Sequence, residues 1–231
     1  MNRAPLIFLG VFCALAFSFV GLVLTNQLTY GAFTTHVDED EGKVFPLQTP
    51  GIAAQGKLVY QDLGCVSCHT QQARREGFGS DIGEHSRGWG ERQSVARDYL
   101  RESRVLLGSQ RIGPDLRNLA VRKNPDNVAF TADWLYRYLF NPKLVVKDSS
   151  MARYAFLFET RKIIGEPSPK ALKLPEIYAP EEGYELVPTA RGEALVAYLL
   201  SLKDTYAYPE TKNVYTPPPA SEEGETKKGH E

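Results

Sequence analysis

The sequence has little cysteine, methionine and histidine, and it has no excess of charge of either sign. The 231 residues include three cysteines, two methionines and four histidines, and 27 basic residues stand against 28 acidic ones. An odd number of cysteines, one of them inside an apolar stretch, makes a disulfide framework a poor interpretation. The balanced charge gives no reason to expect a nucleic-acid partner. The length suits one domain of ordinary size with appendages.

The one long apolar run lies near the amino terminus. Residues 4–24 read APLIFLGVFCALAFSFVGLVL and carry no charge. At about 1.5 Å per residue, a helix of this length spans a hydrocarbon core of about 30 Å. We predict an uncleaved transmembrane anchor rather than a secretory signal, because no clear small-residue cleavage site follows the run. Cys13 follows Phe12, not the small residues expected before a lipidated cysteine.

Charges on the two sides of this run predict the topology. Arg3 precedes the run, whereas His36 and the acidic residues 38–41 follow it. The positive-inside tendency places the amino terminus in the cytoplasm and the rest of the chain in a periplasm or its equivalent. The far end is rich in Pro, Glu and Lys and has almost nothing apolar to bury, so it predicts disorder. We predict four parts: an anchor (1–30), a linker (31–50), a soluble domain (51–205) and a disordered tail (206–231).

Apolar residues recur at helical spacing in three segments of the soluble domain. The predicted helices cover residues 51–64, 131–142 and 190–203. In the third segment the apolar face consists of Leu195, Tyr198, Leu199 and Leu202. The pattern shows little sign of strands and therefore predicts an all-α domain.

Between the second and third predicted helices, prolines exclude a further helix. They stand at positions 167, 169, 175, 180 and 188. We therefore predict an irregular segment that wraps over the surface.

The sequence GCVSCHT, residues 64–70, places two cysteines three apart with a histidine directly after them. A structural zinc site needs four ligands, but there is no second C-x-x-C, and the other histidines are scattered singly. A thioredoxin-like redox pair follows a strand, whereas the residues before this motif predict a helix. Both are poor fits to the sequence.

C-x-x-C-H is the signal for attachment of haem c, and its spacing has a chemical reason. Cys65 and Cys68 fall on one face of a helical turn, where each can form a thioether with a haem vinyl group. His69 then presents an imidazole nitrogen to the iron. We favour one covalent haem c; a small disulfide or another metal site are the alternatives.

A six-coordinate haem needs a second axial ligand. Apart from Met1, the only methionine is Met151, in KDSSMARYAF, beyond the second predicted helix. A single methionine most often fills a gap in a core, but here the haem needs a ligand on its other face. We therefore favour Met151 over His85, which lies in a polar, glycine-rich stretch. Met/His ligation raises the haem potential, as suits a carrier feeding an oxidase.

The order of GCVSCHT, RIGPDL, SSMARY and GEALVAYLLSLK resembles class I cytochromes c throughout the soluble domain. More narrowly, the single anchor, GKLVYQDLGCVSCHTQQARR and RVLLGSQRIGPDLRNL are similar to the membrane-anchored mono-haem subunit, subunit II, of cbb-type (C-family) haem-copper cytochrome c oxidases. The long interval at positions 70–112 supports the narrower resemblance, since simple soluble cytochromes keep it much shorter.

The resemblance implies a fold and several residue roles. The fold would be an all-α class I cytochrome c domain with a long insertion, tethered by one helix in the inner membrane. Pro114 would direct its backbone carbonyl to the ring of His69 and so orient the ligand. Arg111 and Trp89 would be candidates to contact the haem propionates.

The implied function is electron transfer without catalysis of oxygen chemistry. The subunit would accept electrons from a cytochrome c donor or a companion di-haem subunit and pass them toward the haem b/copper catalytic subunit. The alternatives are a stand-alone anchored carrier, the small subunit of a nitric oxide reductase, and a non-redox adaptor. A two-haem peroxidase would need a second motif. The charge-rich residues 74–122 are either a solvated surface or a docking face.

Overall fold

The computed structural model describes residues 3–31, 33–75, 78, 81–82 and 87–211. Their contacts divide the chain into two compact units. One unit combines Met1–Gln48 with Val95–Val105, and the other combines Thr49–Ser94 with Leu106–Glu231. His85, the alternative axial ligand, lies outside the described residues, as does the predicted tail beyond residue 211.

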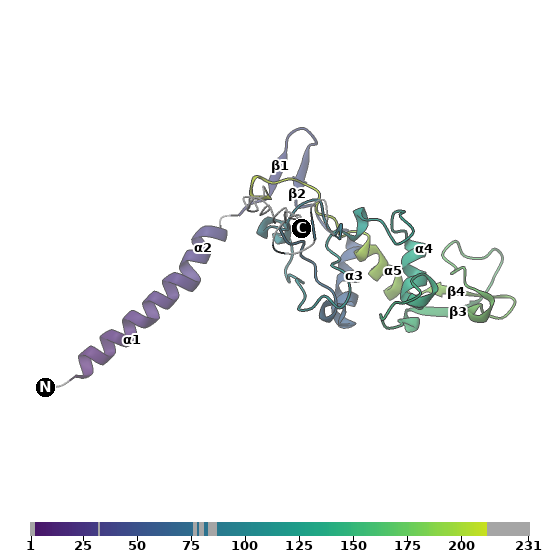
Figure 1. The fold of residues 1–231 in the computed structure, drawn as a ribbon, viewed down its shortest axis with the longest axis horizontal. Coiled ribbons are helices and arrows are strands. Elements are labelled where there is room, and N and C mark those ends of the chain that lie inside the picture. Colours follow the sequence, from purple (N-terminus) through teal and green to yellow (C-terminus); the bar gives the residue numbers. More distant parts are fainter. Residues whose placement is uncertain (1–2, 32, 76–77, 79–80, 83–86, 212–231) are drawn as a thin grey trace, which may run out of the picture. The chain divides into compact units, whose positions relative to one another are not determined.

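The first unit begins with one 27-residue helix, Ala4–Tyr30, drawn at the amino terminus in Figure 1. It consists of α1 (Ala4–Phe19), a stretch of wider π-helical turns (Val20–Leu24) and α2 (Thr25–Tyr30). None of the side chains in these three segments is buried. Within the described ranges this is the one helix long and apolar enough to cross a membrane. The helix therefore fits the predicted anchor.

The predicted linker contains a short hairpin of its own. Strand β1 (His36–Asp38) pairs antiparallel with β2 (Lys43–Phe45). A 3₁₀ turn, Ala96–Tyr99, belongs to the same unit. In this unit Arg97 donates to the Thr34 carbonyl and lies 4.9 Å from the centre of the Phe33 ring. More than sixty positions separate these partners, so local sequence patterns could not reveal the contact.

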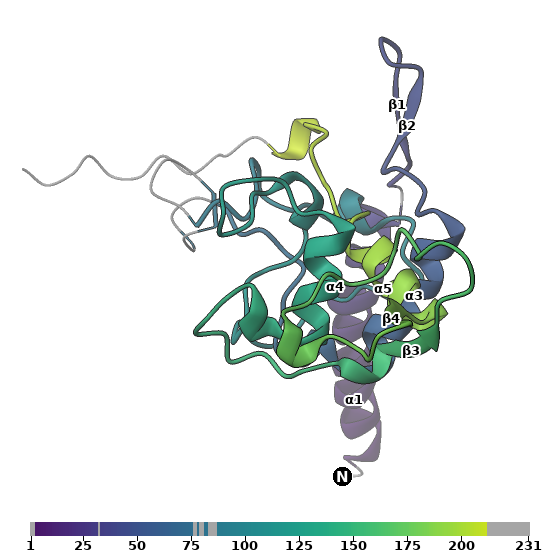
Figure 2. The same cartoon turned by 90° about the vertical axis from the view of Figure 1, so that its right-hand side faces the viewer.

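Among its described residues the second unit contains three α-helices and two strands, which are shown from another side in Figure 2. They are α3 (Gly51–Asp62), α4 (Ala132–Phe140), β3 (Phe158–Lys162), β4 (Tyr184–Pro188) and α5 (Ala190–Leu199). The three predicted helices are confirmed, although α5 ends at Leu199 rather than at residue 203. Threonine hydroxyls cap two of them: Thr131 accepts from the N–H of Trp134, and Thr189 accepts from that of Gly192.

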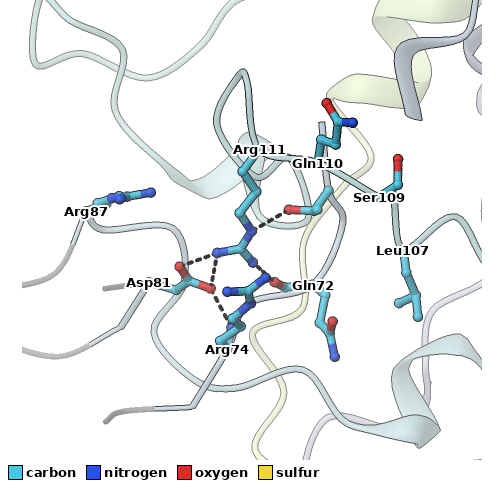
Figure 3. Close-up of a pocket in the computed structure, with 10 residues that line it drawn as sticks. Gln72, Arg74, Asp81, Arg87, Leu107, Ser109, Gln110 and Arg111 are labelled. Carbon is cyan, nitrogen blue, oxygen red and sulfur yellow. Dashed lines mark hydrogen bonds and ion pairs between the residues drawn. The ribbon is translucent and has the colours of Figure 1, made fainter. Parts of the chain in front are cut away.

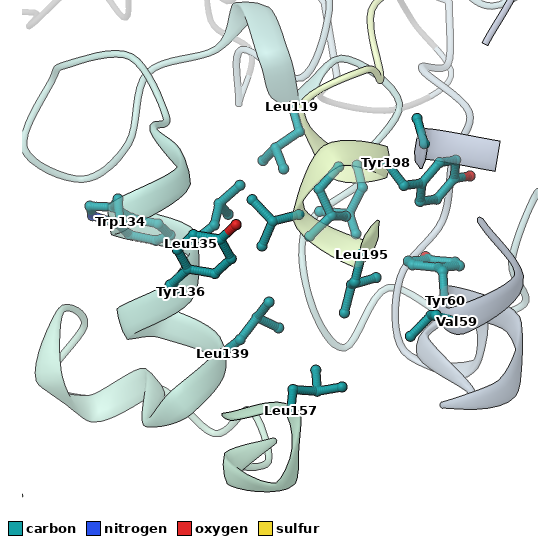
Figure 4. Packing of buried hydrophobic residues seen from close by; sticks show 14 of the residues in the cluster. Val59, Tyr60, Leu119, Trp134, Leu135, Tyr136, Leu139, Leu157, Leu195 and Tyr198 are labelled. Carbon is teal, nitrogen blue, oxygen red and sulfur yellow. The ribbon is translucent and has the colours of Figure 1, made fainter. Parts of the chain in front are cut away.

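Helices α3 and α5 pack closely because a glycine lies where they meet. A Cβ atom on Gly56 would lie 1.8 Å from the carbonyl oxygen of Ala194, so only glycine permits this approach. Beside it the rings of Tyr60 and Tyr198 meet edge to face, with their centres 5.5 Å apart (Figure 4). The apolar face predicted for residues 190–203 is buried, since Leu195, Tyr198 and Leu199 of α5 and Leu202 just after it are all less than 10% exposed. The cysteine motif follows the end of α3, so the packing of α3 against α5 fixes the position of the motif.

The expectation of an all-α domain needs correction. Strands β3 and β4 pair antiparallel, with Phe158 opposite Pro188 and Lys162 opposite Tyr184. Four of the five prolines lie in the irregular connection between these strands, as predicted, but Pro188 ends β4 itself. A proline is tolerated there because the last residue of an edge strand need not donate a ladder hydrogen bond. Helices still predominate, and this two-stranded sheet lies at one end of the helices in Figure 1.

Order also extends past the predicted end of the domain at residue 205. Tyr208 is only 2% exposed, and its ring meets that of Tyr206 with centres 5.0 Å apart. The guanidinium of Arg92 lies over the Tyr208 ring. Composition had assigned residues 206–211 to the tail, but Tyr208 and Thr211 among them are buried.

Candidate haem site

The C-x-x-C-H motif begins where α3 ends. Gly64 adopts a left-handed conformation (φ +68°) that ends the helix, and a 3₁₀ turn, Cys65–Ser67, follows it. The N–H of His69 donates to the Cys65 carbonyl over 3.0 Å, which folds the motif back on itself. Both cysteines carry free thiols; Cys65 is partly buried, and Cys68 is exposed. The turn therefore places two thiols, neither in a disulfide, close together in one short loop.

The His69 ring is held by the segment around Pro114. Its Nδ1 lies 2.8 Å from the Pro114 carbonyl oxygen, the contact that the resemblance implied. Gly113 makes room for the ring, because a Cβ atom there would lie 2.2 Å from His69 Cε1. With Nδ1 engaged, Nε2 is the nitrogen that remains for a metal ion.

The surroundings of His69 favour the neutral imidazole. Burial lowers the pKa of His69, while the Pro114 carbonyl and the Asp115 carboxylate act in the opposite direction. Metal binding requires the neutral ring, since a protonated nitrogen has no lone pair to donate. The site thus presents the histidine in the state that a metal ion needs.

A cavity of about 800 Å³ opens beside His69, a size within the range of cofactor pockets. His69, Pro114 and Met151 line it from three different segments, and Trp134 and Leu139 of α4 form part of its wall. Its lining is predominantly apolar. The structure therefore brings the predicted histidine and methionine, far apart in the sequence, to one cavity.

Met151 is positioned by a hydroxyl bridge and by α4. Its backbone N–H donates to Ser149 Oγ over 3.3 Å, and Ser149 Oγ in turn lies 3.0 Å from the Tyr138 hydroxyl. Just beyond it the N–H of Tyr154 donates to the Leu139 carbonyl over 2.8 Å. These contacts fix the segment that carries the thioether.

Two hydrogen-bond donors that line this cavity are buried without a partner among the described residues. They are Nε of Arg122 and Nε1 of Trp134. Burial lowers the pKa of Arg122 to about 10, which shows how poorly its charge is solvated. Buried donors, and buried cations above all, are costly unless something accepts from them. A ligand with anionic oxygens, such as a haem with its two propionates, would supply the missing acceptors.

Sequence reasoning did not single out Arg122 or Trp134. Arg122 is one of ten arginines in a charge-rich stretch, and Trp134 counted only as an apolar residue of a predicted helix. Neither residue carries a local signal, because what distinguishes them is burial against the cavity. Trp89, one of the two propionate candidates, does line the cavity.

Arg111, the other propionate candidate, is engaged elsewhere. Its guanidinium donates to the Asp81 carboxylate over 2.6 Å, to Thr70 Oγ1 over 2.9 Å and to the Gln72 carbonyl over 2.7 Å (Figure 3). It lines a second, polar hollow and not, among the described residues, the cavity beside His69. The geometry therefore favours Arg122 over Arg111 as a partner for a propionate.

The family of mono-haem cytochrome c oxidase subunits called FixO matches residues 2–185. The chain belongs to this family. No curated protein matches the chain. A FixO-family subunit takes part in electron transfer within a cytochrome oxidase and contains one haem. Family membership also implies a catalytic oxidase partner.

Proposed function

We propose that this FixO-family subunit holds one haem c, attached through thioethers from Cys65 and Cys68, with His69 Nε2 and the Met151 sulfur as axial ligands. The observation that carries the proposal is the shared cavity, which His69 and Met151 both line. Cys65 and Cys68 belong to the short turn that leads into His69. When bound, the haem supplies one-electron redox chemistry. The chain supplies the ligands, an apolar wall that excludes water, and a fixed orientation of the imidazole.

In this proposal the soluble unit is a class I cytochrome c domain of a cbb-type oxidase. It lies on the periplasmic side of the inner membrane, tethered by the helix Ala4–Tyr30 with its amino terminus in the cytoplasm. It takes electrons from a soluble cytochrome c or a companion di-haem subunit and passes them toward the haem b/copper subunit. The apolar helix, the family match and the packing of α3 against α5 all support this assignment.

Purification from native membranes in mild detergent, followed by a reduced-minus-oxidised spectrum, tests the assignment. We expect c-type and b-type haem bands together with oxygen consumption. A c-type band without haem b would instead identify a stand-alone carrier, and the absence of any haem band would overturn the proposal.

The three cysteines offer a matched test of covalent attachment. Cys65→Ser and Cys68→Ser should each weaken retention of haem by the denatured chain, and the double variant should abolish it. Cys13→Ser, in the anchor, should leave retention unchanged. Haem that is lost from the wild-type chain on acid–acetone extraction would contradict covalent attachment.

We further propose that Arg122 and Trp134 donate to the haem propionates. Arg122→Met distinguishes this role by the sign of its effect on the holoprotein. If a propionate accepts from Arg122, the variant loses a charged hydrogen bond and its free energy of unfolding falls by about 1.5–3 kcal/mol. If no anion faces Arg122, removal of a poorly solvated cation raises stability instead. Thermal unfolding followed at the haem absorption band measures the difference.

A further inference from the structure

Beside His69 two stretches of chain run side by side. One carries the motif, from Cys68 to Gln72, and the other contains Gly113 and Leu116. Two backbone hydrogen bonds join them, Gly113 N–H to the Cys68 carbonyl (3.0 Å) and Leu116 N–H to the Thr70 carbonyl (2.8 Å), and Gln71 N–H donates to the carbonyl of Leu107, farther back in the chain (2.9 Å). The contact between His69 Nδ1 and the Pro114 carbonyl lies within this ladder.

Asp115 ties the two stretches together through its side chain. Its carboxylate is fully buried. One oxygen accepts from the Thr70 hydroxyl (2.5 Å) and the Gln72 N–H (2.7 Å), and the other accepts from the Arg117 N–H (2.9 Å). Since Asp115 follows Pro114 and Thr70 follows His69, this carboxylate fixes the Pro114 carbonyl against the imidazole.

Arg111 is the cation that faces this carboxylate. One guanidinium nitrogen lies 3.7 Å from Asp115, and another is paired at 2.6 Å with Asp81, which is also fully buried. Figure 3 shows Arg111 between Asp81 and the backbone of Gln72. Two buried carboxylates therefore share one guanidinium whose side chain is 13% exposed, so these three groups together carry a net negative charge.

Three other arginines lie near Asp115, Asp81 and Arg111. Arg74 and Arg87 line the same polar hollow but are exposed, so water and salt screen their charges. Arg122 lines the cavity, and its charge also interacts with that of Asp115. Asp115 and Arg111 are thus the charges joined directly to the residue that follows His69.

We propose that Asp115 is a positioning residue for the axial histidine and that Asp115 and Arg111 together set the redox potential of the haem, with opposite signs. The inference rests on the proposed function, in which His69 binds the iron. A negative charge near the ligand stabilises the oxidised, more positive iron, and a firm carbonyl contact makes the imidazole a stronger donor. Both effects of Asp115 lower the potential, and Arg111 offsets its charge.

Redox titration of the c-type haem in the purified oxidase complex tests this. Asp115→Asn removes the negative charge, and the midpoint potential should shift to a more positive value. Arg111→Gln removes the compensating cation, and the potential should shift to a more negative value. General loosening of the site would expose the haem and move both variants the same way, so opposite signs distinguish electrostatic positioning from a structural role.

A charge pair elsewhere provides the matched control. Arg161 and Glu185 are joined at 2.8 Å on β3 and β4, strands that contribute no described residue to the cavity lining. Glu185→Gln and Arg161→Gln should leave the potential unchanged. Shifts of equal sign in the two network variants, or no shift in either, would overturn the inference.

The inference can still be tested if one variant fails to retain haem. Should Asp115→Asn not retain haem, Arg111→Lys decides, because it keeps the cation. A potential nearer that of the wild type than in Arg111→Gln supports the inference, and equal shifts in the two Arg111 variants overturn it. Failure of the proposed function looks different, because the wild-type complex would then contain no covalent haem.

Discussion

The two sides of the haem cavity are built differently. On the histidine side, His69 lies within a ladder of backbone hydrogen bonds backed by buried charges. On the methionine side, the one hydrogen bond to Met151 within the described part of the chain comes from Ser149, and the remaining contacts are apolar. The difference shows where orientation matters: an imidazole with a fixed partner at Nδ1 is rigidly directed, whereas a thioether on a flexible side chain adapts to its surroundings.

The largest effect should come from crowding the rigid side. Gly113→Ala places a methyl group 2.2 Å from the position of His69 Cε1, so the ring must move away from the Pro114 carbonyl. We expect a loss of about 1–3 kcal/mol in the free energy of unfolding, together with less haem-loaded protein. Thermal unfolding and the haem-to-protein ratio measure both. Gly51→Ala, whose added methyl group meets nothing within 4 Å, is the control. Equal behaviour of the two variants would show that the histidine side is not rigid.

On the methionine side, a change of ligand should spare the fold. Met151→Leu conserves volume, and we expect it to cost less than about 1.5 kcal/mol and to retain covalent haem. The midpoint potential should nevertheless fall, because a thioether ligand raises it. Leu139→Met, which adds a thioether elsewhere on the cavity wall, should leave the potential near that of the wild type. A wild-type potential in Met151→Leu would contradict ligation by Met151.

A smaller effect should follow loss of the hydroxyl bridge. Ser149→Ala removes the partner of both the Met151 N–H and the Tyr138 hydroxyl, whereas Tyr138→Phe removes one of these contacts. We expect Ser149→Ala to lower the free energy of unfolding by about 1 kcal/mol, and Tyr138→Phe to lower it by less. Chemical denaturation of the two holoproteins compares them directly. If Tyr138→Phe costs more, the Met151 segment depends on packing rather than on this bridge.

The smallest effect concerns a region outside both sides of the cavity. The Ser168 N–H and the Arg161 guanidinium hold the pKa of Glu185 below its ordinary value of 4.5. Because the lowered pKa favours the folded state with Glu185 charged, this stabilisation is present above about pH 4.5 and is lost as the pH falls through the folded-state pKa. Glu185→Gln should therefore flatten the decline of stability in acid. An unchanged slope between pH 5 and about pH 3 would show that Glu185 does not contribute.

Much of the molecule could be predicted from the sequence because the signals were local. The uncharged run that forms Ala4–Tyr30, the helical spacing in α4 and the C-x-x-C-H motif each depend on residues close together in the chain. The β3–β4 pair was missed because its register joins residues about twenty or more positions apart. The buried side chains within residues 206–211 were missed because composition does not reveal that the Tyr208 ring lies under the Arg92 guanidinium.

By itself the sequence determined the anchor, the thiols and the histidine that follows them. These features can be recognised without the fold, because they depend on residue types at fixed spacing along the chain. Only the tertiary structure decided that Nε of Arg122 and Nε1 of Trp134 are buried with no partner among the described residues, that Arg111 pairs with Asp81, and that Asp115 holds the two stretches of chain around His69 together. Each of these roles depends on which polar groups lose contact with water, and burial is settled only when distant segments pack together.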